Sequence, residues 1–284
     1  MIQADLSTIV TYNPWAVSDC TTLSELVGLL DSVDFHHWPI VDDDRRLLGM
    51  LSNSDLVRVF EAGSAALHAP QDHQHARLAF IRSQPVREVM TTRIISVQQN
   101  ESPATALWML LEHHIHSLPV LTDSYLTALV TTSDFLREFS YSGELAATLP
   151  VTEIMQAPCE PIDCDASLDE VAMAMHFAQA TAVPVVRGDM PLGVVSHREV
   201  GMLKLQKTLS EVFGVDVRRQ EATSILALVA SAPTIRPGER ISHAASMMIE
   251  HRRQAIAVVN QAGRLLGIVT EEMVLRSMLD SMRS

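Results

Sequence analysis

One short pattern occurs four times along the chain. In each copy an apolar run closes on Ser or Thr and opens into amphipathic sequence, as in LLGMLSNSDLVR at 47–58. Such a run is typical of a strand, a helix N-cap and a helix in succession. The other copies are LTALVTTSDFLR (126–137), PLGVVSHREVGM (191–202) and LLGIVTEEMVLR (265–276). A repeat of this kind restricts the chain to a set of similar small units.

A second landmark lies upstream of each copy. A short β-branched run begins near Pro39, Pro119 and Pro184 in the first three units, and Ala257 takes the place of the proline in the fourth. Proline is tolerated at the first residue of a strand, because its missing N–H does least harm there. Amphipathic helices are predicted before these runs, at Leu23–Leu30, Ser102–Leu111, Leu168–Phe177 and Ile241–Ile249, and still earlier extended elements end in Val17, Val97, Ile162 and Ile235.

Each unit therefore runs strand, helix, strand, strand, helix, and the predicted fold class is α+β with four βαββα repeats. Three strands and two helices cannot bury both faces of a sheet, so we expect neighbouring repeats to pair into two modules. The Ser/Thr landmarks are roughly 65 to 80 residues apart, which is too irregular for a solenoid. The predicted repeats are 1–62, 84–141, 148–204 and 222–284, and the predicted modules are 1–141 and 148–284.

Charge and composition exclude several classes of partner. The formal net charge is −13 and no basic run stands out, which argues against nucleic acid because such binding depends on neutralising phosphates. No apolar run approaches the roughly 18 residues of a membrane helix, and the first residues do not resemble a signal peptide. Cys20, Cys159 and Cys164 have no CxxC spacing. We therefore expect a cytoplasmic protein that binds neither nucleic acid nor membrane.

The strand–proline landmark, followed in order by a G-h-h-[ST]-x-x-D landmark, resembles the cystathionine-β-synthase (CBS) domain family, whose domains form tandem pairs called Bateman modules. The resemblance covers most of the chain and leaves only linkers. Four copies without a catalytic domain are similar in architecture to the γ subunit of AMP-activated protein kinase and to stand-alone bacterial CBS proteins. The resemblance implies adenosine-type ligands in clefts between paired repeats, and a regulatory role.

Ser52 with Asp55, and Thr131 with Asp134, match the [ST]-x-x-D signature. From the residues alone this is a capping box that satisfies helix N–H groups and contributes about 0.5 to 2 kcal/mol. The resemblance implies a further role, in which the Asp accepts hydrogen bonds from ribose hydroxyls and the Ser or Thr helps the helix N-terminus to hold phosphate. Both interpretations stay open at this point.

The third and fourth repeats depart from this signature. Glu199 lengthens the carboxylate by one methylene, Met273 removes it, and Ser196 with Glu199 is explained by capping alone. We therefore predict that the N-terminal pair binds the ligand. The C-terminal pair is interpreted as structural, dimer-forming or adapted to another ligand.

The resemblance also implies contacts from the early segments and from the positions before the prolines. Early segments supply backbone for base recognition, whereas His37 and His116 are basic groups at the phosphate end. Arg58 follows Asp55 by three residues, and Arg137 follows Asp134 by three residues. At this spacing an intrahelical ion pair and a phosphate contact are equally plausible interpretations. The candidate ligand-binding residues are Thr11, Asn13, His37, Ser52, Asp55, Thr91, Arg93, His116, Thr131 and Asp134.

Two histidine clusters suggest a transition-metal site as a rival interpretation. The sequence contains no HExxH and no carboxylate at a suitable spacing, so exposed histidines are the preferred interpretation and no metal-binding residue is predicted. The clusters are His68, His73 and His75, and His113, His114 and His116.

The sequence contains no phosphate loop, dinucleotide fingerprint, nucleophile elbow or Cys–His arrangement, so no enzyme activity and no catalytic residue is predicted. The favoured hypothesis is a sensor that requires no cofactor and takes an adenosine nucleotide (AMP, ADP, ATP or an S-adenosylmethionine-like molecule) as a regulatory ligand. Ligand binding would reorient the repeats, and an unidentified partner protein would respond. We expect a homodimer through CBS pairing, although four repeats could also close a disc within one chain. The alternative is an oligomeric scaffold with degenerate clefts and no ligand.

Overall fold

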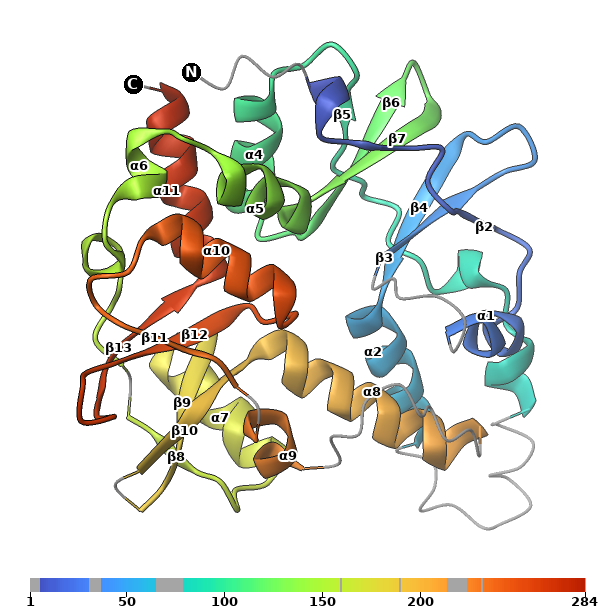
Figure 1. Cartoon of the computed structure of the whole chain (residues 1–284). Helices are drawn as coiled ribbons and strands as arrows, with labels where there is room; N and C mark the ends of the chain where they lie inside the picture. Colours follow the sequence, from blue (N-terminus) through green and yellow to red (C-terminus); the bar gives the residue numbers. More distant parts are fainter. Residues whose placement is uncertain are drawn as a thin grey trace.

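The structure is a computed structural model that describes residues 6–30, 37–64, 79–158, 160–188, 190–213, 224–230 and 232–283. Each repeat forms its own small sheet with flanking helices, and the four repeats are arranged around a common centre (Figure 1). The order strand, helix, strand, strand, helix is the same in all four, which confirms the predicted α+β fold class.

The elements of the N-terminal half are as follows. The first repeat contains β2 (Val17–Ser18), α1 (Leu23–Leu30), β3 (His37–Val41), β4 (Leu47–Ser52) and α2 (Asn53–Ser64). The second contains β5 (Val97–Gln98), α4 (Pro103–Glu112), β6 (Ser117–Thr122), β7 (Tyr125–Thr131) and α5 (Thr132–Tyr141). The early segments of these repeats contain η1 (Leu6–Thr8) with β1 (Thr11–Tyr12), and η3 (Val86–Glu88).

The C-terminal half repeats this plan. The third repeat contains β8 (Ile162–Asp163), α7 (Leu168–Ala178), β9 (Ala182–Arg187), β10 (Met190–Ser196) and α8 (His197–Phe213). The fourth contains β11 (Thr234–Ile235), α10 (Ile241–Glu250), β12 (Ala255–Val259), β13 (Leu265–Thr270) and α11 (Glu271–Arg283). Short connecting helices are α6 (Leu145–Thr148), η4 (Val151–Glu153) and α9 (Ile225–Val229).

One three-stranded arrangement recurs in all four sheets, and β1 adds a fourth strand to the sheet of the second repeat. The two longer strands form an antiparallel hairpin, and the short first strand runs parallel to the first strand of that hairpin. This register places His37 opposite Ser52, and Ser117 opposite Thr131. In these two repeats the residue two positions before the proline therefore lies beside the N-cap of the following helix.

The early segments of the first three repeats pair with the sheet of the neighbouring repeat instead of their own. Strand β1 lies in the early segment of the first repeat but is antiparallel to β7 of the second, with Thr11 opposite Leu129. Thr91 lies in the early segment of the second repeat and exchanges two backbone hydrogen bonds of 2.8 and 2.9 Å with Met50 in β4 of the first. In the C-terminal half, Gln156 bridges to Ile268 in the same manner. This exchange ties each pair of repeats into one module.

Gly267 lies where the exchanged segment crosses β13. A Cβ atom at this position would be 2.7 Å from the carbonyl oxygen of Gln156, a backbone atom that cannot rotate away. We expect Gly267→Ala to lower the free energy of unfolding by about 1 to 3 kcal/mol through overpacking. Urea unfolding measures this change through the midpoint at constant slope.

Gly28 in α1 provides the matched control, because a Cβ there meets nothing within 4 Å. Gly28→Ala should raise the free energy of unfolding by about 0.5 to 1 kcal/mol, since it removes a flexible residue from a helix. Equal effects of the two alanines would contradict the close approach at Gly267.

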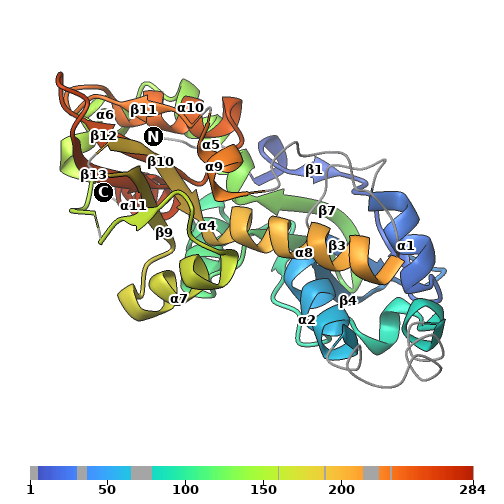
Figure 2. The same cartoon turned by 90° about the horizontal axis from the view of Figure 1, so that it is seen from below.

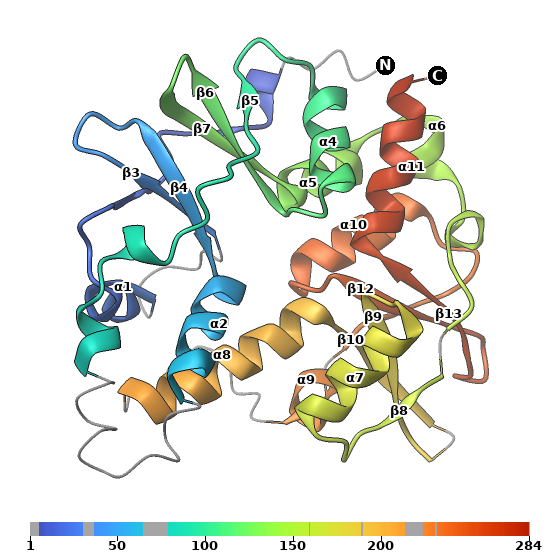
Figure 3. The same ribbon diagram turned by 180° about the vertical axis from the view of Figure 1, so that it is seen from behind.

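The two modules pack against each other through helices. Helix α8 of the third repeat lies along α2 of the first, while α10 and α11 of the fourth repeat pack on α5, and α11 also packs on α4 of the second (Figures 1 and 3). Seen from below, α8 extends from the C-terminal module to the N-terminal one (Figure 2). Leu205 and Leu209 of α8 share a buried cluster with Leu56 and Phe60 of α2.

The ring of four repeats is thus closed within one chain. This is the single-chain disc that the sequence left open beside a homodimer. A homodimer through CBS pairing stays a prediction, and a second copy would need surfaces other than these helix faces. No helix in the described part of the chain is long and apolar enough to span a bilayer.

Candidate functional site

The two [ST]-x-x-D pairs of the N-terminal module have the same geometry. Oδ2 of Asp134 accepts from the backbone N–H of Thr131 at 2.9 Å and from its hydroxyl at 2.7 Å, and the N–H of Asp134 donates back to that hydroxyl at 3.3 Å. Ser52 and Asp55 show the same three distances. The capping-box interpretation is therefore confirmed for both helices, α2 and α5.

Only one oxygen of each carboxylate is used by the cap. Oδ1 of Asp55 pairs with Arg58 at 2.6 Å, and Oδ1 of Asp134 pairs with Arg137 at 3.0 Å. The arginine side chains are 70% and 56% exposed, whereas the carboxylates are 16% and 14% exposed. Because exposed ion pairs contribute only about 0 to 1 kcal/mol, these arginines can leave for another partner at little cost. Each Asp is thus a rigid acceptor with one exchangeable oxygen.

The exchanged segments lie along the strands that lead to the two capping boxes. Thr11 lies opposite Leu129, and the N–H of Asn13 donates to the Thr127 carbonyl at 3.0 Å, so both lie along the strand that leads to Thr131. Asn13 adopts a left-handed φ of 46°. One cluster therefore brings the early segment of the first repeat to the strand that ends at the Thr131–Asp134 capping box of the second.

The second cluster is the reciprocal of the first. Thr91, in the early segment of the second repeat, pairs with Met50, two residues before Ser52 of the first. Arg93 is exposed in the same segment. These residues are candidates from the sequence, but their crossing between repeats was not predicted, because the spacing of the repeats carries no signal for exchange.

His37 and His116 come from different repeats and meet. Their ring centroids are 6.3 Å apart. His37 is half-buried beside Ser52, and the His116 side chain is 51% exposed. The carbonyl of His116 accepts from the Thr132 N–H at 3.1 Å, which fixes it at the start of α5. Both basic groups thus lie near the helix N-termini of the N-terminal module.

Glu271, which was not predicted from the sequence, also lies in this region. Oε1 of Glu271, the first residue of α11, lies 3.6 Å from Nδ1 of His116. Glu271 is buried, with only 6% of its surface exposed. The signal in the sequence was weak, since an acidic residue in the first turn of a helix is ordinary.

The corresponding positions of the C-terminal module are already occupied. Oε2 of Glu199 accepts from the N–H and hydroxyl of Ser196 at 2.7 and 2.9 Å, as in a capping box. Oε1 pairs with Arg253, which also donates to the carbonyl of Leu228. Both charged side chains are only 12% exposed. An arginine of the fourth repeat therefore holds the oxygen that is exchangeable in the N-terminal module.

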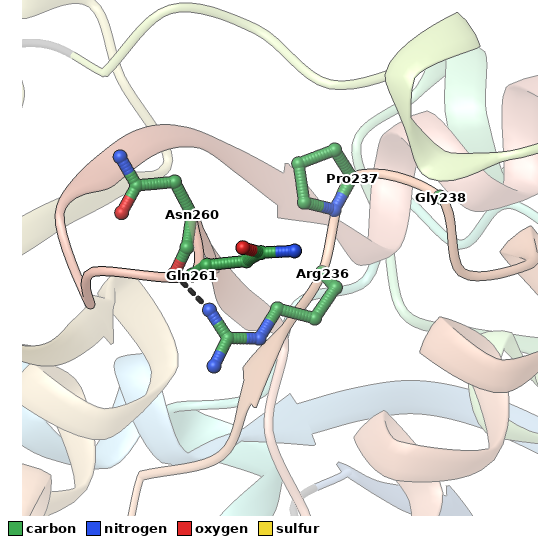
Figure 4. Close-up of a pocket in the computed structure, with 5 residues that line it drawn as sticks. All are labelled: Arg236, Pro237, Gly238, Asn260 and Gln261. Atoms are coloured by element: carbon green, nitrogen blue, oxygen red, sulfur yellow. Dashed lines mark hydrogen bonds between the residues drawn. The ribbon is translucent and has the colours of Figure 1, made fainter.

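A hollow of ≈ 610 Å³ lies elsewhere, at the β12–β13 hairpin (Figure 4). None of the predicted ligand-binding residues lines it, and the Arg236 guanidinium is hydrogen-bonded to the carbonyl of Asn260. It is therefore separate from the candidate site. Its lining residues are Arg236, Pro237, Gly238, Asn260 and Gln261.

Three adjacent residues, Asp163, Cys164 and Asp165, bring their ligand atoms within 4.8 Å of one another. The aspartates are exposed, and such acidic groups are common without an ion. The first predicted histidine cluster lies outside the described residues.

Paired βαββα repeats with exchanged segments and capped helix starts define a two-module repeat protein. The family model for the CBS domain matches residues 6–62, 86–141, 151–200 and 227–280. These ranges cover well over half of the sequence, and the chain belongs to the CBS-domain family, with its four repeats forming two Bateman modules.

Relatives of similar length share this architecture. Protein MJ1225 of Methanocaldococcus jannaschii is 22% identical over 266 residues, which cover 90% of this chain and 92% of MJ1225. Its crystal structure, that of a proposed archaeal homologue of γ-AMPK, aligns with a TM-score of 0.73 at 19% identity and covers 97% of this chain and 100% of its own. A Pyrococcus horikoshii protein aligns with a TM-score of 0.61 at 14% identity, over 96% of this chain and 99% of its own. These similarities establish the fold.

Proposed function

We propose that the protein is a non-catalytic regulatory sensor that binds an adenosine-type nucleotide in the N-terminal pair of CBS repeats. The observation that carries the proposal is which partners the carboxylate oxygens of Asp55 and Asp134 have. Each carboxylate is fixed by its capping box through Oδ2, while Oδ1 pairs with an exposed arginine. A ribose diol needs an acceptor of this kind, positioned in advance and able to exchange its partner.

The neighbouring groups support the same ligand class. Thr11 and Asn13 offer backbone near Asp134, as Thr91 does near Asp55, which suits recognition of a base edge. The helix N-termini, together with His37 and His116, provide positive potential for phosphate within a chain of net charge −13. Arg58 and Arg137 would turn from the carboxylates to the phosphate when the ribose hydroxyls replace them.

Regulation follows from the exchange of segments between repeats. A nucleotide at either cluster contacts two repeats at once, so it favours the relative orientation in which both contacts are made. A partner protein, which stays unidentified, would respond to that orientation. We also propose a cytoplasmic location, based on the lack of paired-cysteine motifs.

The side-chain contacts in the C-terminal module favour a scaffold role for that module. Arg253 occupies the carboxylate of Glu199, and Met273 replaces the carboxylate in the fourth repeat, where its sulfur lies 3.5 Å from the Thr270 backbone nitrogen. Neither position offers an exchangeable acceptor. We infer that this module serves to hold the ring together.

Thermal unfolding in the presence of AMP, ADP, ATP, GTP or S-adenosylmethionine tests the proposal. An adenosine ligand at about 100 times its dissociation constant should stabilise the wild-type protein by about 2.7 kcal/mol, a shift of several degrees. The Asp55→Ala/Asp134→Ala variant should show no ligand-induced shift, because both acceptors are gone.

The two Asp→Ala substitutions remove helix caps as well as the proposed ligand contacts. A control variant must therefore lose a helix cap and keep the ligand contacts. The Ser167–Glu170 capping box of α7 has equivalent contacts of 2.7 and 2.8 Å and lies in the C-terminal module. Glu170→Ala should lower stability slightly and retain the whole ligand-induced shift. The sensor proposal is wrong if no adenosine ligand shifts the wild type, or if the double variant responds like the wild type.

A further inference from the structure

The carboxylate of Glu271 lies where the first, second and fourth repeats meet, beside the imidazole of His116. We propose that these two side chains bind a divalent transition-metal ion with ligand preferences like those of zinc, and that His37 and Gln254 complete its surroundings. This inference goes beyond the nucleotide sensor and does not depend on it, since the metal requires no nucleotide.

The first argument is that the Glu271 carboxylate is buried and needs compensation for its charge. Only 7% of the Glu271 side chain is exposed, and among the described residues Oε1 has no hydrogen-bond partner. An ionised carboxylate removed from water costs several kcal/mol unless a charge or hydrogen bonds compensate it. The position is nevertheless fixed, because the Glu271 N–H donates to the Gln254 carbonyl at 2.7 Å. A cation at Oε1 would supply the missing compensation.

The separation of the two ligand atoms is the second argument. Nδ1 of His116 lies 3.6 Å from Oε1 of Glu271, which is too long for a good N–H···O hydrogen bond. Two ligands of one tetrahedral zinc, each about 2.0 to 2.1 Å from the metal, are about 3.3 Å apart. The observed spacing is close to this value, so a metal fits between the atoms with only small side-chain movement.

Two further groups lie near His116. Nε2 of Gln254 lies 3.5 Å from Nδ1 of His116, and a half-turn of the amide would present its oxygen instead. The His37 ring centroid is 6.3 Å from that of His116, against about 5 Å for two imidazoles on one tetrahedral metal. Two imidazoles, a carboxylate and an amide oxygen or water are donors that zinc accepts.

Exposed histidines were preferred over a metal site from the sequence because no carboxylate had a suitable spacing. Glu271 follows His116 by 155 positions, so no local motif could reveal it. The packing of α11 against α4 and α5 brings the two together. The fold thus supplies the ligand that the sequence pattern lacked.

The experiment is a titration of the full-length, nucleotide-free protein with Co²⁺, whose tetrahedral complexes absorb visible light, followed by displacement with Zn²⁺. Wild-type protein should develop the absorption band, and Zn²⁺ should raise the unfolding temperature. Glu271→Gln and His116→Gln should each weaken metal binding at least tenfold. His114→Gln, beside the site, and Asp163→Asn/Asp165→Asn, at the acidic group on β8, should bind the metal as the wild type does.

Glu271→Gln also separates a metal site from a simple ion pair. Glutamine keeps the shape and removes the buried charge, so without metal this variant should unfold at the same temperature as the wild type or higher. A variant that is less stable without metal, together with a wild type that does not respond to Zn²⁺, would show a His116–Glu271 ion pair only. That result, or binding that survives both ligand substitutions, would overturn the proposal.

Discussion

Replacement of Arg253 by methionine is expected to lower the free energy of unfolding by about 3 to 5 kcal/mol, because removing one member of a buried ion pair leaves the other uncompensated. Arg253 and Glu199 are each only 12% exposed. The substitution also removes the donor to the Leu228 carbonyl. Urea unfolding at neutral pH measures the loss.

An exposed pair of the same chemistry provides the control. Arg276 pairs with Glu272 at 2.7 Å on α11, and their side chains are 54% and 32% exposed. Arg276→Met should cost at most about 0.5 kcal/mol. In addition, Arg253→Met/Glu199→Met should recover part of the loss, since no charge is then left buried. Similar small effects at Arg253 and Arg276 would contradict the role of Arg253 as an internal partner for Glu199.

The contact between modules leads to the second large expected effect. Leu209→Ala should lower the free energy of unfolding by about 2 to 5 kcal/mol, as for other buried leucines. Leu209 is 1% exposed and shares a cluster with Leu56 and Phe60 of the other module. Chemical unfolding followed by circular dichroism provides the measurement.

Lys207 is the matched control on the same helix, because its side chain is exposed. Lys207→Ala should change stability by no more than about 0.5 kcal/mol. A Leu209→Ala variant as stable as Lys207→Ala would show that α8 and α2 do not hold the modules together.

The local elements could be predicted closely. Helix α1 has the predicted bounds, Leu23–Leu30, and the predicted helix Ser102–Leu111 is observed at Pro103–Glu112 with Ser102 as its N-cap. Both depend on short-range signals, namely apolar periodicity and a capping side chain. The capping boxes at Asp55 and Asp134 were predictable for the same reason.

The contacts between repeats could not be predicted. The exchange that places Thr11 beside Leu129 leaves no periodic trace, because a two-residue strand pairs through its backbone. The pair Arg253–Glu199 joins positions 54 residues apart. Helix α8 of the third repeat extends to Phe213 and packs on α2 of the first. Side-chain pairs at such separations are decided by packing, which the sequence pattern does not display.

The central claim is that the N-terminal pair of repeats, and not the C-terminal pair, takes an adenosine nucleotide. Titration calorimetry with AMP, ATP and S-adenosylmethionine tests it most directly, using the wild type, Asp55→Ala, Asp134→Ala and the double variant. We expect an adenosine ligand to saturate the wild type, each single variant to lose one site, and the double variant to give no binding heat. Absence of heat with every ligand, or unchanged binding by the folded double variant, would contradict the account.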